Sequence, residues 1–198
     1  IGGGYCMSYT GEKVKRPRDY AADIVPLIKI LGCKVVMEPG RFIIANAGIL
    51  VTKTTYIKVA TWGKKFVICD AAMNDLARPS LYDAVHRAWP VNTDVPMQEV
   101  EHPGEEKGDD DKLELVDIVG PVCESSDVLA KERWFPDVKE GDLIAFFSAG
   151  AYGFTMSSSY NTRPRTCEIL VDGSSFSTIR RRETCEDLIT GEKEFLSA

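Results

Sequence analysis

The chain has 198 residues, of which 44% are hydrophobic and 27% are charged, a composition that suits one folded domain, or one domain and part of another. No apolar run approaches the ~18–20 residues of a membrane-spanning helix. The net charge of −6 comes from 24 basic and 30 acidic side chains, and residues 94–117 alone hold ten acidic and two basic ones. Because no basic stripe is available to follow phosphates, nucleic-acid binding is disfavoured.

The chain contains few residues suited to metal or disulfide chemistry. Its six cysteines are scattered without a CxxC pair, so we expect neither a zinc site nor a compact disulfide framework. Free cysteines favour a reduced, cytoplasmic setting. Only two histidines are present, His86 and His102, too few for most triads or histidine metal sites. We interpret both as surface or packing residues.

The N-terminal segment has the pattern of a parallel α/β unit. Gly2-Gly3-Gly4 stand near the start of the chain, and because such a run normally follows a strand, we expect a fragment whose upstream part is missing. Asp19 can cap a helix over residues 19–31, which Gly32 would end. Residues 34–38 then predict a short buried strand.

Beyond Arg41, where we place a domain boundary, the pattern indicates mostly antiparallel β structure, a barrel or a sandwich. Ile, Val and Thr dominate residues 42–60, with partial alternation over residues 50–59. Residues 80–86 resemble a helical turn, and residues 94–112 resemble a solvated insertion loop. The further strand candidates are residues 65–70, 113–119, 143–147 and 166–171.

Two segments carry residues that suit an anionic ligand. The backbone N–H groups of Gly2-Gly3-Gly4 can bind a phosphate, although a tight turn without a ligand explains the glycines equally well. Glu38-Pro39-Gly40-Arg41 follows the expected strand, and ligands of parallel α/β folds collect at the carboxyl ends of strands. The two segments would form one site, unless Glu38 and Arg41 simply form a surface salt bridge.

Four motifs then occur in order. Glu38-Pro39-Gly40-Arg41 is followed by DAAMNDLARPSLYD at residues 70–83, by GPVCESSD at residues 120–127, and by Gly150-Ala151-Tyr152-Gly153. Together, over residues 1–173, they closely resemble the diaminopimelate decarboxylases, a branch of the pyridoxal-phosphate fold-type III decarboxylases. Ornithine and arginine decarboxylases of the same family share part of this set, but the arginine–tyrosine and cysteine–glutamate patterns favour diaminopimelate.

The resemblance implies a TIM (β/α)8 barrel followed by an antiparallel β-barrel or sandwich domain. Residues 1–41 would be the C-terminal part of the barrel, and residues 42–198 the whole β domain with its acidic insertion. The Schiff-base lysine of the family lies in the upstream part of the barrel, so we do not expect this chain alone to decarboxylate anything. Residues 155–164 also match the family, and we interpret them as a structural loop near the cofactor.

The family's cofactor is pyridoxal 5'-phosphate. By resemblance, Glu38 lies beside its pyridine nitrogen, where an anion raises the pKa of that nitrogen and keeps it protonated. Glycine amides and a tyrosine hydroxyl would bind the phosphate. The expected cofactor-binding residues are Gly3, Gly4, Glu38, Pro39, Gly40, Arg41 and Tyr152.

The resemblance also implies decarboxylation of meso-2,6-diaminopimelate to L-lysine, the last step of lysine biosynthesis. A site that decarboxylates one end of this molecule must hold the other end, and arginine holds a carboxylate best. Glu124 would pair with the distal ammonium group. The expected substrate-binding residues are Arg41, Arg78, Tyr82, Glu124 and Tyr152.

Cys123 is the expected catalytic residue. A free thiol is mostly protonated at neutral pH, so it can return a proton to Cα after carbon dioxide leaves. Most lone cysteines are small buried hydrophobes, but the motif around Cys123 favours catalysis. In the family this loop reaches the cofactor of the neighbouring subunit, which implies a homodimer with shared active sites.

Two alternatives stay open at this point. One is a related decarboxylase of the ornithine or arginine type. The other is a non-catalytic homologue that dimerises with a true decarboxylase and regulates it, although the retention of Glu38, Cys123 and Tyr152 speaks against it.

Overall fold

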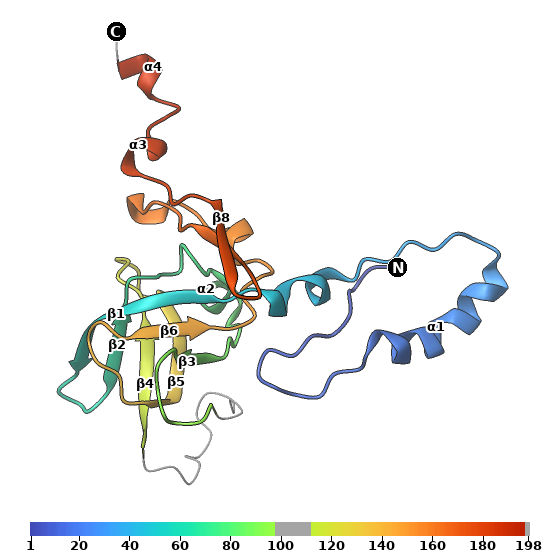
Figure 1. Cartoon of the computed structure of the whole chain (residues 1–198), viewed down its shortest axis with the longest axis horizontal. Helices are drawn as coiled ribbons and strands as arrows, with labels where there is room; N and C mark the ends of the chain where they lie inside the picture. Colours follow the sequence, from blue (N-terminus) through green and yellow to red (C-terminus); the bar gives the residue numbers. More distant parts are fainter. Residues whose placement is uncertain (98–111, 197–198) are drawn as a thin grey trace.

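The computed structural model describes residues 1–97 and 112–196. Its centre is a six-stranded sheet, drawn at the left of Figure 1. The strands are β1 (Leu50–Val59), β2 (Lys65–Cys69), β3 (Ala88–Pro90), β4 (Leu113–Val119), β5 (Val128–Pro136) and β6 (Leu143–Phe146). They lie in the order β3-β6-β1-β2-β4-β5. Neighbouring strands are antiparallel except β2 and β4, which are parallel.

The sheet is nearly closed into a barrel. β1 joins its two halves, because residues 50–53 pair with β6 and residues 54–59 pair with β2. The two edge strands approach each other at Trp89 of β3 and Phe135 of β5, whose ring centroids lie 5.8 Å apart. Closure of this kind leaves little of either strand edge available for pairing with other chains.

The interior of the barrel is mostly apolar. A large aliphatic or aromatic side chain contributes about 1.5–3 kcal/mol when it is fully buried. His86 is also fully buried, and its Nδ1 lies 2.9 Å from the Phe147 carbonyl oxygen. The largest apolar side chains with little or no exposure are Phe135, Phe146, Leu76, Ile118, Leu129, Ile144 and Val67.

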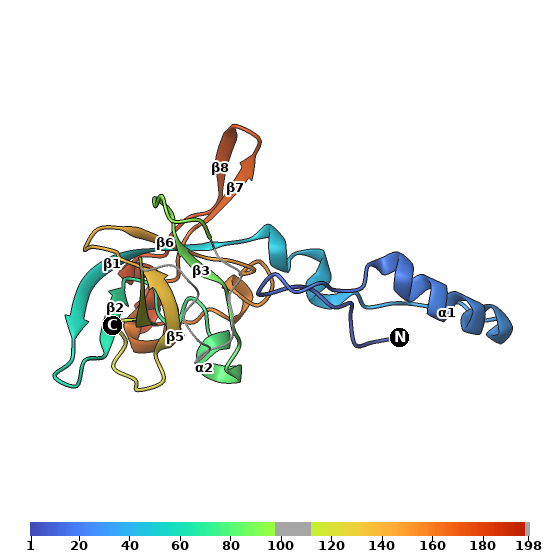
Figure 2. The same cartoon turned by 90° about the horizontal axis from the view of Figure 1, so that it is seen from below.

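Helix α1 (Pro17–Leu31) lies in an N-terminal arm that extends away from the sheet (Figures 1 and 2). It begins two residues before the expected start, because Asp19 is its third residue rather than its cap. The Asp19 carboxylate accepts the Arg16 N–H at 2.8 Å, as in a capping box. Gly32 ends the helix with φ +62°, as expected. No residue of α1 is buried, and Ile30 is 82% exposed.

The expectation of a sheet strand over residues 34–38 is wrong. The segment belongs to no strand, although the Ile1 ammonium donates to the Val36 carbonyl oxygen at 2.7 Å and the Glu38 N–H donates to the Ile1 carbonyl oxygen at 3.2 Å. These two hydrogen bonds have the pattern of a parallel pair. A strand needs a neighbouring strand that pairs with it along its length. In the described part of the chain, only Ile1 forms hydrogen bonds of this parallel pattern with residues 34–38.

The β structure expected at the start of residues 42–60 is also wrong. The chain instead forms two short 3-10 helices, η1 (Gly40–Ile43) and η2 (Ala45–Ala47). They lead into a tight backbone crossing, where a Cβ on Gly48 would lie 2.6 Å from the Gly150 Cα. The compact turns bring the chain to this crossing, and β1 begins only after it.

The remaining elements differ from the expectations by a few residues. Helix α2 (Arg78–Tyr82) replaces the turn expected over residues 80–86, because Pro79 suits a first helical turn and Asp83 adopts a left-handed conformation with φ +51°. Most of the expected insertion, residues 98–111, lies outside the described residues.

The C-terminal segment forms a separate hairpin of β7 (Glu168–Asp172) and β8 (Ser175–Arg180). Two short helices follow, α3 (Cys185–Leu188) and α4 (Lys193–Leu196). The sequence indicated β7 but not β8. Among residues 1–97 and 112–196, no helix has the length and apolar character needed to cross a membrane.

Candidate active site

The glycine run lies against the segment that follows residue 38. Gly4 has φ +67°, and a Cβ there would lie 3.1 Å from the Pro39 carbonyl oxygen. Gly40 has φ +60°, and its Cβ would meet the Gly4 Cα at 3.6 Å. Positive φ favours glycine. The Glu38 Oε2 atom lies 3.6 Å from the Cβ position of Gly2. This glycine cradle groups the expected residues Gly3, Gly4, Glu38, Pro39 and Gly40.

Two arginines converge on one tyrosine. Arg41 Nη1 donates a 3.1 Å hydrogen bond to the Tyr9 hydroxyl, and its Cζ lies 5.4 Å from the centroid of the Tyr9 ring. Arg78 Cζ lies 5.4 Å from the same centroid and 5.8 Å from the ring centroids of Tyr82 and Tyr152. Such distances allow cation–π attraction. The structure therefore brings four of the five expected substrate-binding residues together: Arg41 and Arg78 contact Tyr9, and Tyr82 and Tyr152 contact Arg78.

Neither guanidinium of this cluster forms an ion pair with a carboxylate in the described residues. The Nε atom of Arg78 is also buried without a hydrogen-bond partner. A buried charged donor without an acceptor is costly. Arg41 is exposed, and with the partly buried Arg78 it forms a pair of guanidiniums suited to bind a carboxylate or a phosphate.

Tyr152 is presented by a tight glycine loop. A Cβ on Gly150 would lie 2.1 Å from the Ile44 carbonyl oxygen, and one on Gly153 would lie 2.2 Å from the Ala149 carbonyl oxygen. Neither position has room for a side chain, so the motif folds with backbone against backbone. Tyr152 itself has φ +59° and is 45% exposed. The loop thus directs one ring towards Arg78.

Cys123 and Glu124 lie on the loop between β4 and β5. The Glu124 carboxylate accepts hydrogen bonds from the Ser126 N–H at 3.2 Å, the Ser126 hydroxyl at 3.1 Å and the Tyr160 hydroxyl at 3.5 Å. The bonds from Ser126 in particular lower the pKa of Glu124, so it is anionic at neutral pH. Cys123 is an exposed free thiol. Within the described residues, neither side chain contacts the arginine cluster through a hydrogen bond or an ion pair.

Sequence reasoning missed Tyr9, which belongs to none of the four motifs. Its ring packs edge-on against His86, with centroids 5.1 Å apart and an interplanar angle of 80°. Arg87 donates a hydrogen bond to the Thr10 carbonyl oxygen and fixes the same loop. No local pattern indicates this contact, because it joins residues that are 77 positions apart.

His86 makes the stability of the fold depend on pH. Burial lowers its pKa below the ordinary value of 6.5, and the charges of Arg78, Arg133 and Arg41 act in the same direction. Because the folded-state pKa is the lower one, the stabilisation is complete above pH 6.5 and is lost as the pH falls through the folded-state pKa. We expect the Tm of the protein to decline more steeply with acid than that of His86→Gln, in unfolding scans from about pH 8 to about pH 5. Equal slopes would contradict this.

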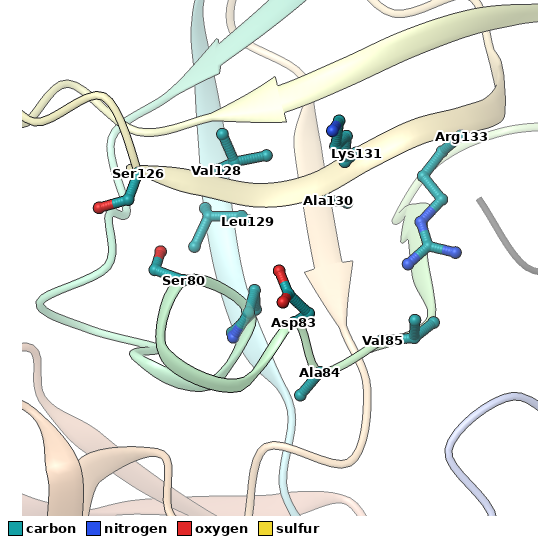
Figure 3. Close-up of a pocket in the computed structure, with 11 residues that line it drawn as sticks. Ser80, Asp83, Ala84, Val85, Ser126, Val128, Leu129, Ala130, Lys131 and Arg133 are labelled. Carbon is teal, nitrogen blue, oxygen red and sulfur yellow. The ribbon is translucent and has the colours of Figure 1, made fainter. Parts of the chain in front are cut away.

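A cavity of about 220 Å³ lies between α2 and β5 (Figure 3). Ser80 and Asp83 line it from the helix side, and Val128, Leu129 and Arg133 line it from the strand. None of the expected site residues lines this cavity. The candidate active site is therefore the glycine cradle with the arginine cluster, and not this cavity.

Residues 5–150 match the family model of the pyridoxal-dependent decarboxylase C-terminal sheet domain. Because this match covers most of the chain, the chain belongs to the pyridoxal-dependent decarboxylases and contains their C-terminal sheet domain. The resemblance drawn from the four motifs is confirmed.

Curated relatives narrow the class. The diaminopimelate decarboxylase of Aquifex aeolicus is 42% identical over 190 residues, which cover 96% of this chain and 41% of the relative. That of Pseudomonas aeruginosa is 45% identical over 192 residues, which cover 97% of this chain and 42% of the relative. The chain therefore spans about two-fifths of the length of these relatives.

Solved structures agree with these relatives. AQ1208 from Aquifex aeolicus has a TM-score of 0.84 and 41% identity, covering 96% of this chain and 44% of its own. Diaminopimelate decarboxylase from Helicobacter pylori, complexed with L-lysine, has a TM-score of 0.82 and 39% identity. The match covers 98% of this chain and 44% of the Helicobacter pylori chain. A lysine/ornithine decarboxylase from Vibrio vulnificus shares the fold, with a TM-score of 0.67, 24% identity, and coverage of 83% and 41%.

Proposed function

We propose that this chain is the C-terminal part of a carboxy-lyase that uses pyridoxal 5'-phosphate to convert meso-2,6-diaminopimelate into L-lysine and carbon dioxide. The observation that carries this proposal is the convergence of Arg41 and Arg78 on Tyr9. The substrate has an amino-acid group at each end, so the end that does not react still presents a carboxylate for these guanidiniums. Relatives named diaminopimelate decarboxylase, and a related structure complexed with L-lysine, support the same substrate and product.

The same cluster disfavours the ornithine or arginine alternative. Those amino acids have no carboxylate at their distal end, so their binding would leave Arg41 and Arg78 desolvated without an anion. A site built around charged groups rejects analogues that lack the matching charge, because its own charges are then buried and unpaired.

The glycine cradle fits the cofactor. Its positive-φ glycines leave backbone N–H groups open to a phosphate, and the Glu38 carboxylate lies beside them. When bound, pyridoxal phosphate supplies an electron sink for the electron pair left at Cα. Glu38 holds a proton at the pyridine nitrogen, because a neighbouring anion raises the pKa of that nitrogen. The proposed cofactor-binding residues are Gly3, Gly4, Glu38, Pro39, Gly40, Arg41 and Tyr152.

The other residues orient the substrate and return a proton. Arg78 binds the distal carboxylate among the rings of Tyr82 and Tyr152. Glu124, anionic at neutral pH, pairs with the distal ammonium group. Cys123 donates its thiol proton to Cα after carbon dioxide leaves. Lysine keeps the amino-acid end that Arg78 and Glu124 bind.

Tyr9 should orient the two guanidiniums. Tyr9→Phe removes the acceptor of the Arg41 hydrogen bond, and we expect KM for meso-diaminopimelate to rise about tenfold while kcat stays within about twofold. Tyr5→Phe is the matched control, because the Tyr5 hydroxyl lies 3.5 Å from Met37 Sδ instead of an arginine. Steady-state kinetics measure both variants, and equal KM values for the two would contradict the role of Tyr9.

The domain organisation and the assembly belong to the same proposal. Residues 1–41 would complete an upstream TIM barrel in the cytoplasmic enzyme, which would explain the exposed face of α1, and residues 42–198 would form the β domain. Cys123 and Glu124 form a cluster apart from the arginines, which fits a homodimer whose second copy supplies them.

The shared site is testable with hybrid dimers. Glu38→Gln and Cys123→Ala each inactivate both sites of their own homodimer. A hybrid of the two variants contains one site with neither change, so random mixing should restore roughly a quarter of the wild-type rate. The measurement is carbon dioxide release after the subunits are dissociated and reassociated. Recovery no greater than the sum of the two parents would contradict shared sites.

The proposed activity is tested on the longer protein that includes this chain, loaded with pyridoxal phosphate. We expect meso-diaminopimelate to yield L-lysine and carbon dioxide in equal amounts. Absence of product would favour the regulatory homologue, and faster release from ornithine or arginine would favour the related decarboxylases.

A further inference from the structure

Asp127 ties two motif-bearing loops together. Its carboxylate is buried, with 4% of the residue exposed, and it accepts the Met73 N–H at 2.7 Å and the Val122 N–H at 2.8 Å. Its own backbone accepts the Gly120 N–H at 3.1 Å and donates to the Glu124 carbonyl oxygen at 3.0 Å. Both carboxylate oxygens are therefore used, one on each loop.

The contact between these loops is close enough to require a glycine. A Cβ on Gly120 would lie 2.4 Å from the Asp127 Oδ2 atom and 2.7 Å from the Ala72 Cα. Backbone cannot move away from such a clash as a flexible side chain could. The loop that carries Cys123 and Glu124 is thus held directly against residues 71–75, which lead into α2 and Arg78.

A third loop joins the same network. The buried Asn74 side chain accepts from Arg163 Nε at 3.0 Å and donates to the Ser158 carbonyl oxygen at 3.3 Å. Arg163 also donates to the Asp70 carbonyl oxygen. These bonds hold the loop of residues 155–164 in place, which fits its interpretation as a structural loop. We call Asn74, Asp127 and Arg163 the polar clamp.

We propose that the polar clamp is a positioning device that fixes the loop of Cys123 and Glu124 against the loop that leads to Arg78, an inference that rests on the proposed function. In the proposed homodimer these two loops of one subunit serve different active sites, so the clamp sets how Cys123 and Glu124 reach the partner's site. None of the three clamp residues is among the proposed substrate-binding or cofactor-binding residues. It acts through backbone atoms of the two loops, and a displacement of about 1 Å at a reacting group can cost on the order of a hundredfold in rate. Misplacing Cys123 lowers kcat, and misplacing Glu124 raises KM.

Asp127→Asn is the decisive variant, because an amide can accept only one of the two backbone N–H groups and turns its NH2 group towards the other. Asp117→Asn is the matched control. Asp117 is equally buried, with 4% exposure, and it accepts the Glu132 N–H at 2.8 Å and pairs with Lys64 at 2.7 Å. It lies within β4, and its carboxylate bonds to Glu132 and Lys64 instead of the two motif-bearing loops. Both changes should lower Tm.

In the holoenzyme, we expect Asp127→Asn to lower kcat/KM for meso-diaminopimelate on the order of tenfold or more, and Asp117→Asn to leave it within about twofold. Amide hydrogen exchange supplies a readout independent of activity. Asp127→Asn should speed exchange together over residues 71–75 and 121–126, whereas Asp117→Asn should not.

The inference is overturned if Asp127→Asn matches Asp117→Asn in kcat/KM, or if exchange over residues 121–126 is unchanged. Should Asp127→Asn not fold, Arg163→Lys carries the same test, because this side chain is 30% exposed and lysine lacks the guanidinium fork. A wild-type enzyme without decarboxylase activity would contradict the proposed function alone, since the exchange data still test the clamp.

Discussion

Replacing Arg78 by alanine is expected to lower kcat/KM for meso-diaminopimelate about a thousandfold, because the distal carboxylate would enter the site without its main partner. Arg78 lies among the rings of Tyr9, Tyr82 and Tyr152 and has no acidic partner in the described residues. Arg78→Lys keeps the charge but loses the planar fork, so a loss of about a hundredfold is expected. Steady-state kinetics on the holoenzyme measure both.

Arg181→Ala is the control for Arg78. Arg181 also has a carboxylate-binding fork, engaged with Asp187 at 2.7 Å through two nitrogens, but it lies in the C-terminal segment. We expect its kcat/KM to stay within about twofold of the wild type. If Arg78→Ala keeps a kcat/KM as close to that of the wild type as Arg181→Ala does, Arg78 does not bind the distal carboxylate.

Replacing Glu38 by glutamine is expected to lower kcat on the order of a hundredfold or more with little change in KM, because a neutral amide cannot hold the proton at the pyridine nitrogen. The side chain keeps its size and its place beside Gly2, so cofactor binding should survive. The measurement is kcat at saturating substrate, together with cofactor content from absorbance.

Glu140→Gln is the control for Glu38, since Glu140 is exposed in the turn before β6. Its kcat should equal that of the wild type. A Glu38→Gln enzyme that retains its cofactor and the wild-type kcat would show that the carboxylate has no electrostatic role in the reaction.

Stretches rich in apolar and β-branched residues predicted much of the barrel. The partial alternation over residues 50–59 coincides with β1 and the expected bounds of β4 match the structure, whereas those of β2 and β6 extend one residue further than the strands do. β5 was not predicted, because Lys131, Glu132 and Arg133 interrupt its apolar run. Glu132 also has φ +51°, which breaks the alternation of side chains along the strand. β3 has three residues, too few for any period to be visible.

The residues of the candidate site could be predicted where they belong to a recognisable motif, and not elsewhere. Glycines at residues 4 and 40 and the carboxylate of Glu38 lie together as the α/β pattern indicated. Tyr9 could not be found, because its contacts with Arg41 and Arg78 exist only after distant segments meet. The prediction of a strand over residues 34–38 was wrong although the local pattern suits a strand. A strand forms only where another strand pairs with it, and the local pattern does not report the presence of that partner.

The most direct test of this account compares substrates on one enzyme preparation. If Arg41 and Arg78 bind the distal carboxylate, kcat/KM for meso-diaminopimelate should exceed that for D-lysine by on the order of a thousandfold. D-lysine has the configuration of the carbon that reacts and keeps the distal amine, but it lacks the distal carboxylate. Comparable values for the two amino acids would contradict the account.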